Sequence, residues 1–181
     1  VTVSGSSNAI TINGTGDTVS SSSATVSVTA NSAATFTGDA NTFNTAAGSA
    51  LTVTGNSETI NAASGSTVNA TGGYAATVVI GWWFGYPIFG SIDYSNKING
   101  SGATISIGAG SLATITGSND SISVAGNANV TASGTGETIN VTGTGSTINV
   151  SSSTVGLANG VTATVNGNSN GVNVGANDTL N

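Results

Sequence analysis

Residues 117–124 read GSNDSISV, and residues 134–141, seventeen positions later, read GTGETINV. Each unit opens with a polar, glycine-containing segment and ends with apolar side chains that alternate with Ser or Asn. Alternation with a period of two is typical of a strand that buries one face. A fixed spacing between such units is typical of a repeat architecture. The two units therefore predict a coil of about seventeen residues.

The same spacing connects apolar positions along most of the chain. One column contains Phe43, Ile60 and Thr77, then Ile105, Ile122 and Ile139, and later Val155 and Val172. A second column contains Val19, Phe36, Val53 and Ala70, then Ile98, Ile115 and Ala132. Two columns indicate two inward-facing strands per coil. One turn of the coil is expected to need glycine for a positive φ or a close approach, at Gly38, Gly55, Gly72, Gly117 and Gly134. We therefore expect an all-β, single-domain parallel β-solenoid over residues 1–181, with about ten coils stacked roughly 4.8 Å apart.

Both columns are interrupted at the same place. The steps from Thr77 to Ile105 and from Ala70 to Ile98 are each 28 residues, eleven more than one coil. We therefore expect an insertion at residues 81–91. A β-sandwich or barrel is the alternative fold, but such folds do not usually repeat one unit with constant inward positions.

The insertion differs in composition from the rest of the chain. It contains both tryptophans and the only proline, and its bulk does not fit a thin core. Three interpretations are open: a loop that covers its own rod, a contact between subunits, or a platform on which sugar rings stack. We predict a subunit contact, because aromatic clusters supply much of the binding energy of interfaces. Its residues are Trp82, Trp83, Phe84, Tyr86, Pro87, Ile88 and Phe89.

Charge is scarce and almost entirely negative. Only 4% of residues are charged, the net charge is −6, and Lys97 is the one base. Such a chain cannot neutralise a phosphate backbone, which excludes nucleic acid as a plausible partner. It also lacks a basic patch for anionic membranes and an apolar run long enough for a spanning helix. We therefore expect no membrane insertion.

The sequence offers little for catalysis. It has no His and no Cys, which excludes Ser–His and Cys–His nucleophiles and thiolate metal sites. Asp120 and Glu137 are seventeen residues apart and should stack at one corner, as a glycosidase pair or a weak Ca²⁺ site would require. Each lies beside a turn, so we expect both to be solvated corner residues. We predict that the protein is not an enzyme and has neither a cofactor nor a metal site.

Units such as 117–124 and 134–141 resemble the repeats of bacterial secreted β-solenoid proteins. These include haemagglutinin-like and autotransporter adhesins and large type I-secreted surface proteins. The resemblance implies an extracellular or cell-surface structural role. A second resemblance is to ice-binding solenoids, which array Thr-X-Thr on a flat face. Segments 35–37, 52–54 and 114–116 have that pattern and are expected in one row.

These observations lead to one functional hypothesis. We expect an exported, extracellular subunit that polymerises into a β-solenoid fibre through end-to-end stacking and the aromatic insertion. No capping segment is visible, and an open coil exposes unpaired backbone groups that favour stacking. The partner would be a second copy of the chain. The alternative is an adhesin or other binding rod with an extracellular glycan or ice as its ligand.

Overall fold

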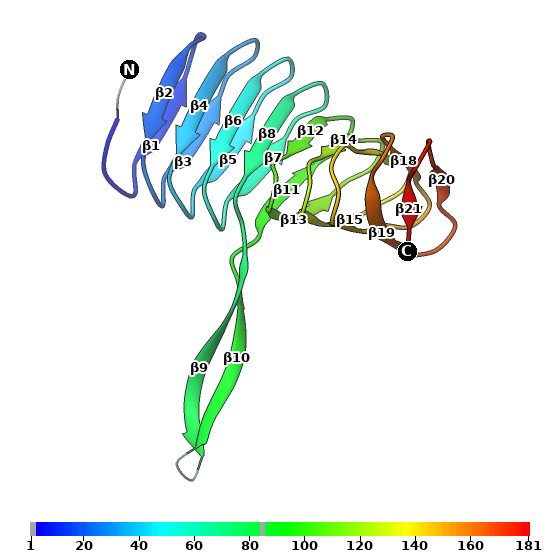
Figure 1. Cartoon of the computed structure of the whole chain (residues 1–181). Coiled ribbons are helices and arrows are strands. Elements are labelled where there is room, and N and C mark those ends of the chain that lie inside the picture. The colour runs from blue at the N-terminus through cyan, green and yellow to red at the C-terminus, as the bar shows by residue number, and fades with distance from the viewer. Residues whose placement is uncertain (1–2, 84–85) are drawn as a thin grey trace.

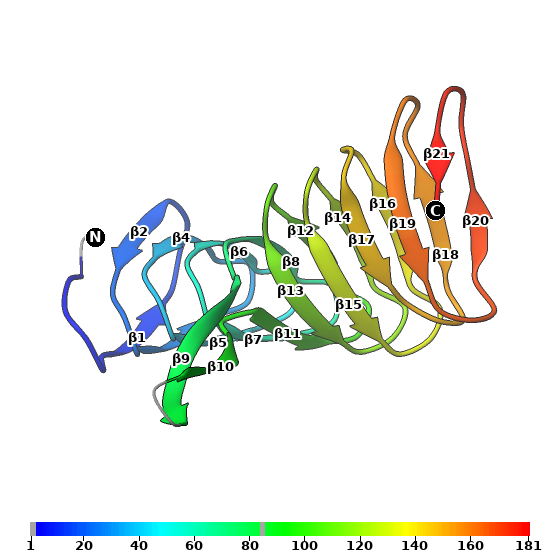
Figure 2. The same cartoon turned by 60° about the horizontal axis from the view of Figure 1, so that its bottom comes forward.

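The computed structural model describes residues 3–83 and 86–181, and it confirms the solenoid. The chain coils about one axis, and the coils follow one another in a single row from the N-terminus to the C-terminus (Figures 1 and 2). In the described residues, two parallel sheets face each other, with ten and nine strands, and a separate pair of strands forms a hairpin. Helix is absent from this part of the chain.

Each complete coil contributes one short strand to each sheet, and the last strand of the chain adds to sheet 1 alone. Sheet 1 contains β1 (Ala9–Ile12), β3 (Thr25–Val28), β5 (Thr42–Thr45), β7 (Thr59–Ala62), β11 (Asn96–Gly100), β13 (Leu112–Thr116), β15 (Asn129–Ser133), β17 (Ser146–Asn149), β19 (Thr162–Asn166) and β21 (Thr179–Leu180). Sheet 2 contains β2 (Asp17–Ser20), β4 (Ala33–Thr37), β6 (Ala50–Thr54), β8 (Thr67–Thr71), β12 (Thr104–Ile107), β14 (Ser121–Val124), β16 (Thr138–Val141), β18 (Thr154–Leu157) and β20 (Gly171–Asn173). The hairpin consists of β9 (Ala75–Trp83) and β10 (Tyr86–Asp93).

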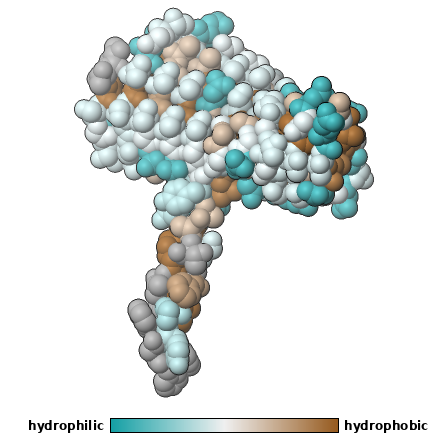
Figure 3. All heavy atoms as spheres, in the orientation of Figure 1, coloured by the Kyte–Doolittle hydropathy of each residue, from teal (hydrophilic) through white to brown (hydrophobic). Residues whose placement is uncertain are grey.

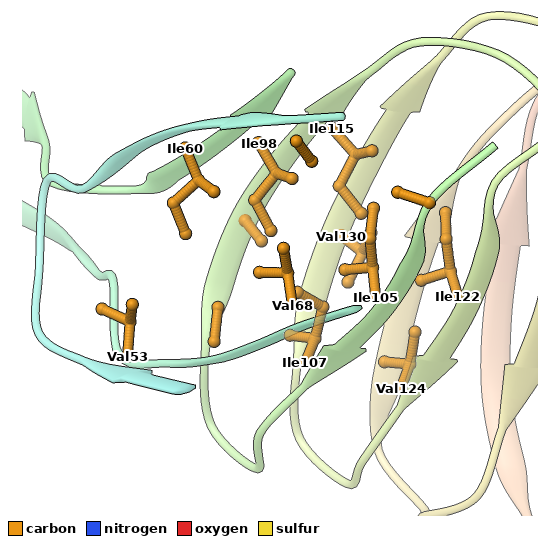
Figure 4. Packing of buried hydrophobic residues seen from close by; sticks show 14 of the residues in the cluster. Val53, Ile60, Val68, Ile98, Ile105, Ile107, Ile115, Ile122, Val124 and Val130 are labelled. Carbon is orange, nitrogen blue, oxygen red and sulfur yellow. The ribbon is translucent and has the colours of Figure 1, made fainter. Parts of the chain in front are cut away.

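The space between the sheets is a thin, mainly apolar core. In sheet 1, Ile60, Ile98 and Ile115 lie in a row (Figure 4). Val68 and Ile105 lie across from them in sheet 2. All five side chains are buried, which follows from the period-two alternation of short β-branched strands.

Polar ladders cover the outer faces. The Asn61 amide donates a hydrogen bond of 2.8 Å to Asn44, and the Asn99 amide donates one of 3.2 Å to Asn61. These side chains stack because equivalent residues of successive coils lie one strand spacing apart. The ladders add to the backbone hydrogen bonds that already join each coil to the next.

The two columns that were read from the sequence exchange sheets at the hairpin, which corrects the prediction. Ile60 stacks on Ile98, not on Thr77, and Ala70 stacks on Ile107, not on Ile98. Thr77 lies in the hairpin, outside the coils. The stacking of Ile105, Ile122 and Ile139 and then of Val155 and Val172 is confirmed.

The size of the insertion explains the exchange. The chain passes from sheet 2 to sheet 1 in 7 residues between Val53 and Ile60, but it needs 28 between Ala70 and Ile98. The true insertion is therefore 21 residues, and the hairpin extends from Ala75 to Asp93 instead of over 81–91. From β3 to β8, strands of four and five residues alternate. β11, the next strand of the rod after β8, has five residues like β8, so one four-residue strand is missing from the alternation. This missing half-coil of about ten residues offsets part of the 21-residue insertion. The columns in the sequence therefore show an excess of only eleven residues over one coil.

The exchange also moves the glycine turns. Gly38, Gly55 and Gly72 lie where the chain passes from sheet 2 to sheet 1, which we call edge A. Gly117 and Gly134 lie where it passes from sheet 1 to sheet 2, which we call edge B. The expectation of a single turn is therefore wrong, because edges A and B lie on opposite sides of the rod.

The expected row of Thr-X-Thr segments is divided for the same reason. Thr35, Thr37, Thr52 and Thr54 belong to sheet 2, whereas segment 114–116 belongs to sheet 1. The segments therefore lie on opposite faces of the rod. The flat threonine face on which the ice-binding resemblance rested is reduced to neighbouring coils of sheet 2.

Candidate functional site

The hairpin is the feature that departs most from the coil. It is inserted in a corner at edge A, between Gly73 and Ser95, and leaves the rod sideways (Figure 1). At its base the rings of Tyr74 and Tyr94 stack with centroids 4.8 Å apart, and the Tyr94 amide donates to the Tyr74 carbonyl at 2.8 Å. The Ser57 amide of the preceding coil donates to the Tyr94 carbonyl at 3.0 Å. The rod and the hairpin are thus joined by backbone bonds at a defined point.

The predicted contact residues lie at the far end of this hairpin. Trp82 and Trp83 end β9 and pair through the backbone with Pro87 and Tyr86. Ile88 pairs with Gly81 and Phe89 with Val79, with a bulge between Ile88 and Phe89. Phe84 lies outside the described residues. The structure therefore brings the other predicted residues together at one end of an antiparallel pair.

The described side chains of this region are exposed. Tyr86 is 75% exposed, Phe89 61% and Ile88 40%. Figure 3 shows apolar residues along the projecting hairpin, in contrast with the weakly polar surface of the rod. The prediction that the insertion leaves the rod is confirmed. The interpretation in which it folds back to cover the rod does not fit this geometry.

The base of the hairpin carries the only acid of its two strands. The Asp93 carboxylate accepts a hydrogen bond from the Ser95 amide at 2.8 Å. This bond, with a smaller contribution from the charge of Lys97, lowers the pKa of Asp93 below its ordinary value. Asp93 is therefore a solvated anion where the hairpin meets the rod, and residues 75–92 contain no charged side chain.

Three other acids are buried inside the corners. Glu58 is 0% exposed and Asp120 and Glu137 are each 1% exposed, so the expectation of solvated corner residues is wrong. Their position in the coil explains the burial. Each lies three residues after a glycine, where other coils have Asn41, Ser153 or Asn170.

These side chains form hydrogen-bonded ladders along the rod. At edge A the Asn41 amide N–H donates to Glu58 Oε2 at 2.8 Å, and the Glu58 N–H donates to Asn96 Oδ1 at 3.1 Å. At edge B the Ala103 N–H donates to Asp120 Oδ1 at 2.8 Å. The Asp120 N–H in turn donates to Glu137 Oε2 at 2.8 Å. Each side chain thus satisfies a buried backbone donor of the preceding coil.

Burial dominates the acidity of these groups. Loss of solvation raises the pKa of Glu58 from 4.5 to about 7, although the hydrogen bonds from Asn41 oppose the shift and the Asp39 charge adds to it. Burial also raises the pKa of Asp120 and of Glu137, against the hydrogen bonds from Ala103 and Asp120. Among the described residues, Asp120 Oδ2 and Glu137 Oε1 are buried without a hydrogen-bond partner.

The paired acids do not form a recognisable chemical site. Asp120 and Glu137 do stack, as the sequence predicted, but both face the interior of a corner. Where the structure describes the chain, three or more potential ligands from His, Cys, Asp and Glu do not gather anywhere. We interpret the acids as elements of the corner. The sequence signal that would have revealed this is their equivalence with Asn41 and Asn170.

The two ends of the rod expose core residues. Next to the first coil, a pocket of about 250 Å³ is lined in part by Val3, Ile10 and Val19. At the other end, Val174 is 57% exposed and Leu180 43%. The end strands β1 and β21 of sheet 1, and β2 and β20 of sheet 2, have a strand neighbour on one side only. Both ends of the described rod thus present apolar side chains, and at the first coil the Ser20 N–H of β2 donates to the Val3 carbonyl at 3.1 Å.

Comparison with known proteins returns no match to a protein family, to a curated protein or to a solved structure. In the described residues, there is also no helix that is long and apolar enough to span a bilayer.

Proposed function

We propose that this protein is an extracellular structural subunit that polymerises by stacking the last coil of one copy on the first coil of the next. The observation that supports the proposal is the continuous parallel register of the coils, in which each strand of a sheet stacks on its equivalent in the preceding coil. A pocket at the first coil is lined in part by Val3 and Ile10, and Val174 and Leu180 are exposed at the last coil. Burial of such surface is favourable at roughly 25 cal/mol per Å².

The coil geometry supports this contact. Successive coils in the described rod are joined by the same parallel ladder, mostly with a step of seventeen residues. A further coil could therefore continue both sheets in the existing register. Contact between unlike ends does not close on itself, so repetition generates a filament.

The low charge of the outer faces is compatible with a structural role. The sheets present ladders of Thr, Ser and Asn, and the strongest departures from this pattern are the hairpin and the two ends. The hairpin leaves the rod between β8 and β11, away from both ends (Figures 1 and 2). End-to-end stacking therefore does not require it, and the hairpin needs a separate explanation.

Electron microscopy of negatively stained protein tests the proposal. For the parent chain we expect filaments that are as wide as the cross-section of a single rod. The double substitution Val174→Asp/Leu180→Asp should yield separate rods, because two carboxylates would have to be desolvated at the stacking surface. The matched control is Tyr86→Ser/Phe89→Ser in the hairpin, which should still form filaments. Separate rods for the parent chain at all concentrations would refute the proposal.

A further inference from the structure

The hairpin has no neighbouring sheet. Strands β9 and β10 pair only with each other in the described sheet order, in a two-stranded sheet that is distinct from both sheets of the rod. An isolated two-stranded hairpin is marginal in water. Nine residues of β9 at about 3.3 Å per residue give a reach of roughly 30 Å. The hairpin can therefore contact a surface that the rod itself does not touch.

Its composition restricts the partner. Residues 75–92 carry no charge, so a charged peptide, a nucleic acid or an ionic polysaccharide finds no complementary group there. Described residues of the outer part include Tyr86, Ile88 and Phe89, all exposed. Large aromatic side chains, with Trp and Tyr foremost, are favoured at the boundary between lipid tails and water.

A second copy of the chain fits less well than lipid. A two-stranded ribbon of this length offers only about 300 Å² on each face. Two hairpins packed face to face would thus bury far less than the roughly 1,200 Å² of a stable protein interface. A lipid interface, in contrast, can surround both faces of the ribbon.

We propose that the outer part of the hairpin, with the exposed Tyr86, Ile88 and Phe89, inserts into the interfacial layer of a zwitterionic lipid membrane and tethers the rod to it. Tyr86 and Phe89 lie about 10 Å apart along β10, so a hairpin that enters obliquely to a depth of roughly 5–10 Å covers both and leaves the outer edges of its backbone near water. The Asp93 carboxylate and the stacked Tyr74 and Tyr94 lie at the base, outside the inserted part.

The charge of the chain determines the type of lipid. The net charge is −6 and Lys97 is the one base, so anionic headgroups repel the rod instead of attracting it. The sequence-based argument against membranes considered basic patches and spanning helices, and neither applies to an uncharged hairpin. Binding should therefore be strongest on neutral phosphatidylcholine and insensitive to salt.

Tryptophan fluorescence reports on the hairpin alone, because Trp82 and Trp83 are the only tryptophans in the chain and both lie in the hairpin. With phosphatidylcholine vesicles we expect a blue shift of tryptophan emission, quenching by lipids brominated near the headgroup, and flotation of the protein with the vesicles. Tyr86→Ser/Phe89→Ser should reduce the vesicle-bound fraction roughly tenfold, since both side chains would lie in the inserted part. Val174→Asp/Leu180→Asp, at the far end of the rod, should bind vesicles like the parent chain.

Three results would overturn the proposal. The first is unchanged emission and no flotation with phosphatidylcholine. The second is a blue shift that depends on protein concentration without vesicles, which would assign the hairpin to a second copy. The third is binding only to phosphatidylserine vesicles that disappears at about 0.5 M salt, where electrostatic attraction is screened. Filament formation is scored separately on the same variants, so failure of either proposal leaves the other testable.

Discussion

At the scale of single residues, the corner glycines define how closely coils approach. A Cβ atom on Gly117 would lie 1.4 Å from the Gly100 carbonyl oxygen of the preceding coil. A Cβ on Gly134 would lie 1.5 Å from the Gly117 oxygen. Glycine is required here because backbone lies directly against backbone along edge B.

Substitution of Gly117 tests this close approach. Gly117→Ala should lower the free energy of unfolding by about 2 kcal/mol or more, because two coils must separate to admit the methyl group. Gly156→Ala is the matched control, since its Cβ would meet nothing nearer than 3.9 Å. It should change stability by less than about 1 kcal/mol. Urea denaturation measures both, and equal losses would contradict the assigned coil contact.

The buried acids make stability depend on pH in an unusual direction. The pKa of Glu58 is raised from 4.5 to about 7 in the folded chain, so the folded state holds a proton that the unfolded state releases between these values. The contribution of Glu58 is therefore fully present below pH 4.5 and is lost as the pH rises to about 7. Asp120 and Glu137 act in the same direction, because their pKa values are also raised.

We therefore expect the protein to melt at a higher temperature near pH 4.5 than near pH 8. Glu58→Gln should remove a share of the difference, on the order of 3 kcal/mol of unfolding free energy. The amide keeps an oxygen for the Asn41 N–H. Asp93→Asn is the control, because the pKa of this exposed carboxyl is lowered and its substitution should leave the trend intact. The melting temperature is measured by thermal melts from pH 4 to 8. A melting temperature that falls toward pH 4.5 would contradict the burial of these groups.

At the scale of elements, the strands and their alternation could be predicted from sequence, whereas their assignment to sheets could not. The alternation around Ile122 and Ile139 identifies an inward-facing strand wherever it occurs. It does not reveal which of two similar sheets receives that strand. The 28-residue step from Ala70 to Ile98 is the result of a 21-residue insertion and the loss of a half-coil in the sequence pattern. Only the pairing of Ile98 with Ile60 shows how many residues belong to each.

The boundaries of the hairpin give a prediction at this scale. Deletion of residues 74–94, which joins Gly73 to Ser95, restores a step of seventeen residues from Ile60 to Ile98. We expect this variant to keep its β-type circular dichroism and to melt within a few degrees of the parent chain, because the insertion belongs to neither sheet of the rod.

The control deletion removes only residues 81–91, the insertion expected from sequence. It should also fold, but with a solvated stub of ten residues at edge A that proteases remove. If the 81–91 deletion folds and the 74–94 deletion does not, part of the hairpin belongs to the coil.

At the scale of the molecule, the solenoid follows from the repeat, but the candidate sites follow only in part. The departure of the insertion from the rod can be predicted, because two adjacent tryptophans do not fit a core of stacked Val and Ile. The burial of Glu58, Asp120 and Glu137 does not follow from the sequence, because acidic residues beside a turn are ordinarily solvated. Each of these carboxylates accepts a hydrogen bond from a corner N–H of the preceding coil, and this pairing is apparent only in the stacked structure.

Stacking of the last coil of one copy on the first coil of the next is tested most directly by cryo-electron microscopy of the purified protein. We predict filaments in which the layer spacing of roughly 4.8 Å continues without interruption from one copy to the next, with a hairpin projecting once every ten or so coils. Val174→Asp/Leu180→Asp should abolish them. Separate rods of about ten coils, roughly 50 Å long at every protein concentration, would contradict the claim.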